Sequence, residues 1–192
     1  MNYFLTNKSV IDSKGNKIPL DTLSLDTESL ISLTKKFILF QKQEESQILF
    51  PVYPSELLLT KSEEDLQCSF VIPSQLNQNY KDQISHFSLE IKNLIPKHLC
   101  TASICLICYV IQQQMIVAVC RLNEIKYFNI FTFKTEIECL YFANAAYKQA
   151  ALDPEIDPVY FFGQISSNSS IANLFRSYFR MVEFPAESKS EL

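Results

Sequence analysis

Three apolar runs follow one another closely in the second half of the chain. They span residues 103–111, 115–122 and 125–133, and only two or three residues separate each run from the next. Each run is of strand length and rich in β-branched and aromatic residues, and the separations are those of hairpin turns. The pattern therefore predicts an antiparallel meander of three buried strands.

The segment after the meander alternates between helical and extended patterns. Thr135 and Glu138 have the spacing of a capping box, and apolar residues recur at helical intervals from there to a loop at 153–158 that contains two prolines. The apolar run 159–165 follows and is of strand length. We therefore expect a helix after Thr135 and then a fourth buried strand.

Two short elements and a tail complete this half. Ser169 or Ser170 can cap a last helix, and residues 181–184 can add a fifth strand. Residues 186–192 are mostly polar. The order of three strands, helix, strand, helix and strand predicts a mixed α/β lobe over 100–185, followed by a polar tail.

The first half opens on a predicted hairpin. Its strands lie at 9–12 and 16–20, and Gly15 stands in the turn. Further extended segments are expected at 48–60 and 67–72, where prolines favour bends and sheet edges.

Two helices are expected beside these strands. The first begins at Asp26 or Thr27, and its apolar residues recur at helical spacing, at Leu30, Leu33, Phe37 and Phe40. The second spans 79–95 and ends at Pro96. We expect a smaller, reduced α+β lobe over residues 1–99.

Composition and charge narrow the class of protein. The chain has 192 residues, 47% of them apolar, with 15 Phe and 9 Tyr, which is typical of a globular protein with an aromatic core. The net charge is −4, and Lys and Arg form no long run. No basic patch is therefore available for a nucleic-acid backbone, and we expect no nucleic-acid partner.

Neither a signal peptide nor a membrane span is predicted. The N-terminus has no cationic segment ahead of a long apolar one, and the longest apolar run, 104–111, is far too short to cross a bilayer. Most of the six cysteines lie inside apolar runs, where Cys acts as a small buried hydrophobe. We expect a cytoplasmic protein with reduced thiols.

The stretch from Phe128 to Phe184 resembles a known family. Its cues are Asn129, Phe131 to Phe133, Leu152, Asp153, Pro154, Phe162, Gly163, Ile165, Leu174 and Tyr178. With these residues the stretch resembles a Bacteroidetes family named domain of unknown function 3822, whose fold is similar to that of actin-like ATPases. The order of elements is also similar to a ribonuclease-H-like or actin-like ATPase lobe.

The resemblance implies a place for a nucleotide. In the actin-like superfamily a glycine-rich turn between strand and helix contacts adenosine, and Gly163, Gln164 and Ser166 occupy that place here. A strand-to-helix turn with a serine cap explains the same residues without any ligand. Both interpretations stay open at this point.

The remaining parts of such a nucleotide site are missing. Phosphates need backbone amides and small residues in a hairpin turn, with carboxylates nearby to hold Mg²⁺. The candidate turn at 112–114 is Gln-Gln-Gln and offers neither Gly nor Asp. The strand before it, 103–111, also contains no acid, which excludes a two-metal nuclease of the ribonuclease-H class.

Cys105 and Cys108 form a CxxC motif close to Cys100 and His98. On a strand, residues three apart point to opposite faces and cannot both bind one ion. We therefore expect buried thiols and no metal. The other histidine, His86, is expected on a helix at the boundary or surface of the core.

These observations favour one function and leave two alternatives. We expect a non-catalytic interaction or scaffold protein that keeps a degenerate actin-like fold for its surfaces, with another protein or a second copy of itself as partner. No catalytic residue, metal or cofactor is expected. The alternatives are an ATP binder with weak or no hydrolysis, and a hydrolase that uses His86 or His98.

Overall fold

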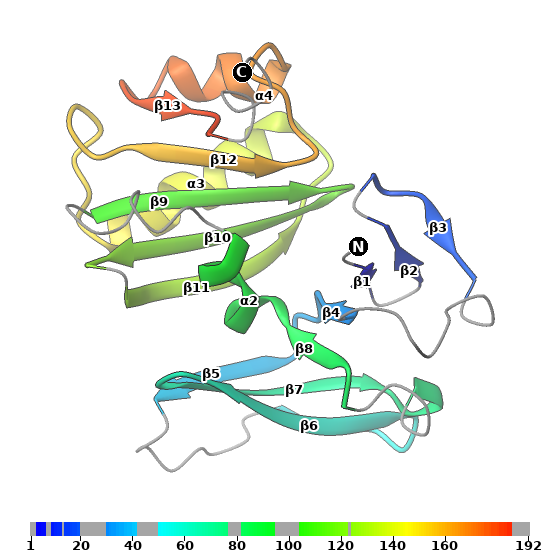
Figure 1. Cartoon of the computed structure of the whole chain (residues 1–192). Coiled ribbons are helices and arrows are strands. Elements are labelled where there is room, and N and C mark those ends of the chain that lie inside the picture. The colour runs from blue at the N-terminus through cyan, green and yellow to red at the C-terminus, as the bar shows by residue number, and fades with distance from the viewer. Residues whose placement is uncertain are drawn as a thin grey trace. The chain divides into compact units, whose positions relative to one another are not determined.

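The chain folds into two compact units, Met1–Leu94 and Ile95–Leu192. The computed structural model describes residues 3–6, 9–12, 14–19, 30–41, 50–76, 82–94, 104–122 and 124–185. Each unit is built around a mixed five-stranded sheet (Figure 1). The fold is therefore mixed α/β, as the sequence predicts.

The second unit contains the predicted meander and both later strands. Its strands are β9 (Ile104–Ile111), β10 (Gln114–Arg121), β11 (Glu124–Thr132), β12 (Val159–Gly163) and β13 (Val182–Glu183). They lie in the order β11-β10-β9-β12-β13. The first three pair antiparallel, whereas β12 runs parallel to β9, and β13 runs parallel to β12.

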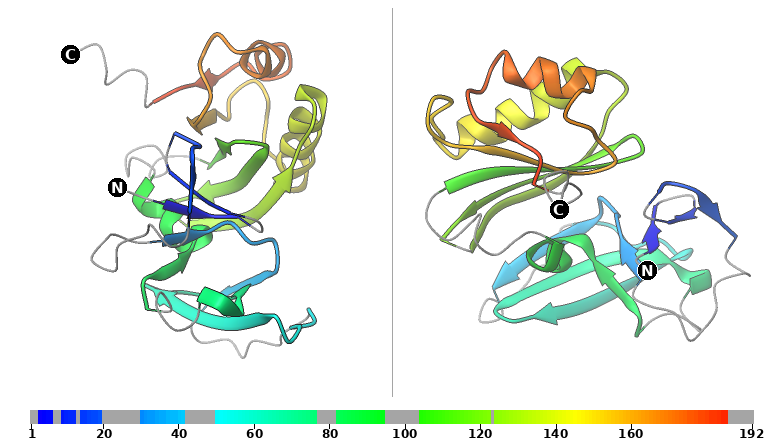
Figure 2. Two further views of the ribbon diagram at one scale, coloured as in Figure 1. Left: turned by 90° about the vertical axis from the view of Figure 1, so that its right-hand side faces the viewer. Right: turned by 45° about the horizontal axis from the view of Figure 1, so that its top comes forward.

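Helices α3 (Glu136–Gln149) and α4 (Ser170–Arg176) pack on one face of this sheet (Figure 2). The capping box predicted at Thr135 and Glu138 is confirmed. The core under the helices takes side chains from both helices and from alternating strand positions, among them Leu106, Val117, Phe161, Ala143 and Phe175. The alternation follows from the two-residue period of a strand, which sends every second side chain to the same face.

Ser169, rather than Ser170, is the N-cap of α4. Its hydroxyl oxygen accepts a hydrogen bond from the Ala172 N–H at 3.2 Å, whereas the exposed Ser170 donates to Glu136. Ser169→Ala is therefore expected to lower the free energy of unfolding by about 1 kcal/mol in urea denaturation. Ser170→Ala is the matched control and should change it by less than about 0.5 kcal/mol. A larger loss from Ser170→Ala would contradict this assignment of the cap.

The first unit repeats the strand order of the second. Its sheet contains β1 (Tyr3–Leu5), β2 (Val10–Ile11), β3 (Lys17–Ile18), β4 (Leu30–Ser32) and β8 (Ile84–His86), in the order β3-β2-β1-β4-β8. Again the first three strands along the chain, β1, β2 and β3, pair antiparallel. Strand β4 runs parallel to β1, and β8 runs parallel to β4. The predicted first hairpin is confirmed as β2 and β3, with Gly15 at a φ of +88°.

A second, three-stranded sheet is inserted between β4 and β8. It contains β5 (Phe37–Gln41), β6 (Glu56–Glu63) and β7 (Leu66–Pro73) in the antiparallel order β5-β7-β6, and the short 3₁₀ helix η2 (Ser74–Leu76) follows. The extended segments predicted near 48–60 and 67–72 correspond in part to β6 and β7.

The helix predicted to carry Leu30, Leu33, Phe37 and Phe40 is wrong. These residues lie in or directly after β4 and β5, and residues 30–34 are all buried. A run of consecutive buried residues fits a strand that is covered on both faces. The spacing of the four named apolar residues also fits one face of a helix, which explains the wrong prediction. The proposed caps, Asp26 and Thr27, lie outside the described residues.

The helix predicted over 79–95 is wrong in its first part. The chain forms β8 over Ile84–His86 and begins α2 (Phe87–Leu94) directly afterwards. Tyr80 and Pro96 lie outside the described residues, as does the polar tail at 186–192. Among the helices of the described segments, none is long and apolar enough to cross a membrane.

Candidate functional site

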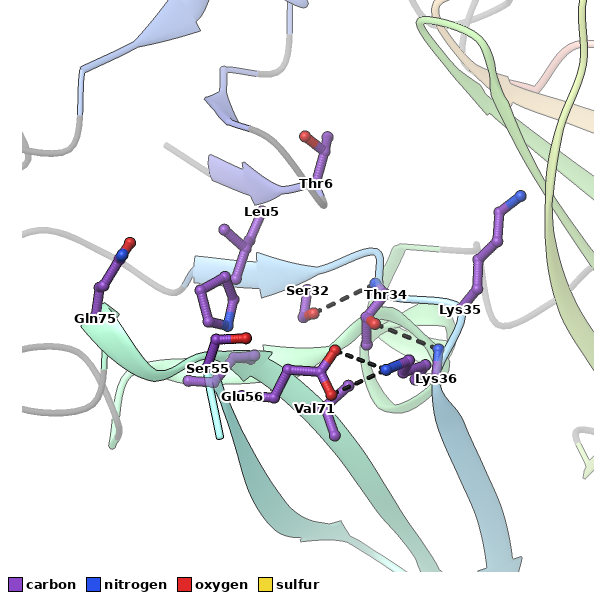
Figure 3. Close-up of a pocket in the computed structure, with 12 residues that line it drawn as sticks. Leu5, Thr6, Ser32, Thr34, Lys35, Lys36, Ser55, Glu56, Val71 and Gln75 are labelled. Atoms are coloured by element: carbon purple, nitrogen blue, oxygen red, sulfur yellow. Dashed lines mark hydrogen bonds and ion pairs between the residues drawn. The ribbon is translucent and has the colours of Figure 1, made fainter. Parts of the chain in front are cut away.

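A cavity of about 410 Å³ opens in the first unit, at the carboxyl ends of β1 and β4. The start of β6 and the end of β7 complete its wall (Figure 3). Carboxyl ends of parallel strands are the usual place for ligands in α/β sheets. The sequence did not reveal this cavity, because its residues come from segments as far apart as Leu5 and Gln75.

An ion pair forms part of the cavity wall. Lys36 Nζ lies 2.7 Å and 2.9 Å from the two carboxylate oxygens of Glu56, which also accept a hydrogen bond from the Tyr53 N–H at 3.1 Å. The Tyr53 ring centroid lies 4.2 Å from the same ammonium. The hydrogen bond from Lys36 lowers the pKa of Glu56, so the carboxylate stays ionised. Lys36 and Glu56 therefore cancel each other's charge.

The turn that follows β4 brings two hydroxyl groups to the cavity. The Ser32 hydroxyl accepts a hydrogen bond from the Thr34 N–H at 3.4 Å, and the Thr34 hydroxyl accepts one from the Lys36 N–H at 3.3 Å. Such side-chain acceptors are typical of turns built on Ser and Thr. Lys35 follows Thr34 in the chain, occupies an exposed position and lines the same cavity.

His86 holds this turn from inside the core. Its Nε2 lies 3.1 Å from the Thr34 carbonyl oxygen, and because a carbonyl can only accept, Nε2 carries the proton. Nδ1 therefore accepts, from the Ser88 hydroxyl at 2.8 Å and from the Ser88 N–H at 3.2 Å. The rings of Phe37 and Phe70 lie 4.6 Å and 5.3 Å from the imidazole.

The position expected for His86, at a helix boundary or surface, is wrong. The side chain is fully buried at the end of β8, and burial lowers its pKa to about 4. The bond between Ser88 and His86 has the geometry of a nucleophile and its base, but both residues are completely buried and no substrate can reach them. The pair is therefore part of the core. His98 lies outside the described residues.

The three residues predicted to contact adenosine lie at the end of β12 and in the turn that follows it. Gly163 has a φ of +87°, and a Cβ atom added there would lie 2.1 Å from the Val110 carbonyl oxygen. This close approach to β9 requires glycine irrespective of any ligand. The Ser166 carbonyl accepts a hydrogen bond from the Ser169 N–H at 3.1 Å and so shapes the turn into α4.

Gln164 links this turn to the hairpin between β9 and β10. Its side-chain oxygen accepts a hydrogen bond from the Gln112 N–H at 2.8 Å, and its own N–H donates to the Val110 carbonyl at 2.7 Å. The Gln113 carbonyl accepts from the Phe133 N–H at 3.0 Å. The hairpin amide that could face a phosphate is thus bonded to the chain's own glutamine. A role of the turn in adenosine binding stays a prediction.

The CxxC cysteines lie on opposite faces of β9, as expected. Both are buried, and Cys108 packs in the core under the helices while Cys105 faces away from it. Burial raises the pKa of Cys108, and that of Cys139 to about 12, so both remain thiols at neutral pH. Within the described segments no three His, Cys, Asp or Glu residues are grouped to hold a metal. Cys100 lies outside those segments.

Comparison with known proteins supports the fold and leaves the activity open. The model of a family described as "Protein of unknown function (DUF3822)" matches residues 39–182. A crystal structure from Bacteroides thetaiotaomicron, described as a protein with actin-like ATPase fold and unknown function, superposes with a TM-score of 0.73. The two chains are 13% identical, and the match covers 95% of this chain and 89% of that one. No curated protein matches the sequence.

Proposed function

We propose, given that this chain belongs to the family described as Protein of unknown function (DUF3822) and has an actin-like ATPase fold, that it turns over no nucleotide and acts by binding another protein or a second copy of itself. We place this activity in the cytoplasm. The observation that carries the proposal is the bond between the Gln164 side chain and the Gln112 N–H.

That bond lies where an ATPase of this fold would need free donors. Phosphate groups are held by backbone N–H groups of hairpin turns, and a carboxylate must hold the accompanying Mg²⁺. Here the turn residues 112–114 are all glutamine, residues 163–166 contain no acid, and the Gln112 N–H already has its acceptor. A nucleotide at these turns would have to displace an internal hydrogen bond, and neither turn offers a carboxylate to hold its Mg²⁺.

An exposed apolar pair on α3 supports the interaction part of the proposal. Ile137 and Tyr141 are one helical turn apart and are 72% and 68% exposed. Large apolar side chains of this exposure on neighbouring turns are frequent in interaction surfaces. Affinity capture from native cells with Ile137→Asp and Tyr141→Asp tests this part, and Ile156→Asp, equally exposed outside α3, is the matched control. A partner retained by all three variants would contradict a role for α3.

Mg-ATP is expected to leave the melting temperature unchanged at millimolar concentration. A ligand at a hundredfold excess over its dissociation constant adds about 2.7 kcal/mol to the free energy of unfolding, which is visible as a shift of several degrees. Thermal denaturation with Mg-ATP and Mg-GTP measures this directly. A saturable rise with either nucleotide, or ATP hydrolysis above the buffer rate, would contradict the proposal.

A nucleotide binder without hydrolysis is the second candidate. The observation that favours it is the cavity at the carboxyl ends of β1 and β4, where Lys35 is exposed. The same nucleotide titration, repeated with Lys35→Met, separates the two candidates. Nucleotide binding that depends on Lys35 would support the second candidate, and unchanged binding by Lys35→Met would count against it.

A further inference from the structure

Among the described residues, two buried hydroxyl groups that line the cavity have no acceptor for their protons. Ser32 and Thr34 are 1% and 8% exposed, and both line the cavity (Figure 3). Each hydroxyl oxygen accepts a backbone N–H, but within the described part of the chain neither hydroxyl donates to any group. Buried donors without a partner are rare in folded proteins, because each such group loses its bond to water. Both protons are thus available to a ligand that carries acceptors.

The charges around the cavity indicate a ligand with a single negative charge. The Lys36 ammonium and the Glu56 carboxylate neutralise each other, so Lys35 carries the uncompensated charge among the lining residues that the structure describes. A monoanion would balance it. A dianion or a triphosphate would place excess negative charge beside Glu56, at a cost that rises as water is excluded.

One part of the remaining wall is apolar. Leu5, Val71 and Pro73 form it, and the polar side chains of Thr6, Ser55 and Gln75 line the cavity beside them. Its volume of about 410 Å³ lies at the small end of the range of ligand pockets. These dimensions suit a molecule with an acidic head and a short hydrocarbon body.

We propose that this cavity binds the carboxylate of a small monocarboxylic acid, with the hydroxyls of Ser32 and Thr34 donating to its oxygens and the Lys35 ammonium balancing its charge. The hydrocarbon part lies against Leu5, Val71 and Pro73. A carboxylate has two acceptor oxygens, which match the two free hydroxyl protons. This inference is independent of the proposal that the protein turns over no nucleotide.

Titration calorimetry of the full chain with straight-chain monocarboxylates from acetate to hexanoate tests the proposal. Binding is expected to be saturable and to tighten as the chain lengthens at constant charge. Inorganic phosphate and Mg-ATP are the competing oxyanions and are expected to bind at least about tenfold more weakly. Tighter binding of phosphate or Mg-ATP than of every monocarboxylate would overturn the proposal in favour of a phosphate ligand.

Two variants remove the proposed contacts, and two further variants serve as controls. Thr34→Val keeps the side-chain shape without the hydroxyl, and Lys35→Met removes the ammonium; each is expected to weaken monocarboxylate binding by about tenfold or more. Thr34→Ser keeps a hydroxyl and should restore binding, whereas Lys148→Met, on an exposed position of α3, should leave it unchanged. Circular dichroism confirms that each variant is folded. The proposal would be overturned if the unmodified chain showed no saturable binding, or if Thr34→Val and Lys35→Met bound monocarboxylates as tightly as the unmodified chain does.

Discussion

Gly163→Ala is expected to destabilise the protein by about 3 kcal/mol or more. The backbone at Gly163 has a φ of +87°, which costs an alanine about 1 to 2 kcal/mol. The added methyl group would also lie 2.1 Å from the Val110 carbonyl oxygen and 2.9 Å from a ring carbon of Tyr109. Because the first of these atoms is backbone, β9 and β12 would have to move apart. Urea denaturation of the full chain measures the loss.

Gly15→Ala is the matched control for this variant. Gly15 has nearly the same φ, +88°, in the hairpin turn between β2 and β3. The difference between the two alanine variants therefore reports the close approach of Val110 to Gly163, separately from the cost of the backbone conformation. Equal losses would contradict this account. Nucleotide binding that disappears in Gly163→Ala while the stability stays unchanged would instead support an adenosine-contacting turn.

The free energy of unfolding is expected to fall by about 3 kcal/mol, through His86 alone, between pH 6.5 and pH 4. Burial lowers the pKa of His86 from 6.5 to about 4 in the folded state. Below pH 6.5 the unfolded chain therefore takes up a proton that the folded chain does not accept. This contribution is fully present above pH 6.5 and is lost as the pH falls through the folded value.

Urea denaturation of the unmodified chain and of His86→Gln at a series of pH values tests this expectation. Carboxylates also titrate in this range in both proteins, so the difference between the two curves isolates His86. His86→Gln should be less stable at pH 7, where the bonds to Thr34 and Ser88 are lost, and should lose less stability on acidification. Parallel curves for the two proteins would show that His86 does not titrate as its burial requires.

The second unit was predictable because its strands are long. Strands β9 and β10 each hold eight residues, most of them Ile, Val, Leu or Cys, and the capping box of α3 marks the next boundary without ambiguity. Gly163, at the end of β12, has a positive φ, a conformation that glycine adopts readily. What the sequence did not show was how closely β9 lies against it.

The five-stranded sheet of the first unit resisted prediction because its strands hold two or three residues each. A stretch of that length, such as β1 or β4, cannot show whether its apolar period is two or 3.6. The spacing of Leu30, Leu33, Phe37 and Phe40 then fits a helix although two strands from different sheets produce it. The same error concealed the turn that contains Thr34 and Lys35, and with it the cavity.

The position of β9 in its sheet has a consequence during synthesis on the ribosome. Strand β9 is the first of its unit to be made, and its neighbours in the finished sheet are β10 and β12. The hairpin with β10 can form at once, but β12 leaves the ribosome roughly 50 residues later, after roughly 3 to 10 s of translation. During that interval one edge of a strand of mostly buried apolar residues has no partner. A nascent chain in this state is a ready substrate for chaperones, and slower codons after β11 would prolong its exposure.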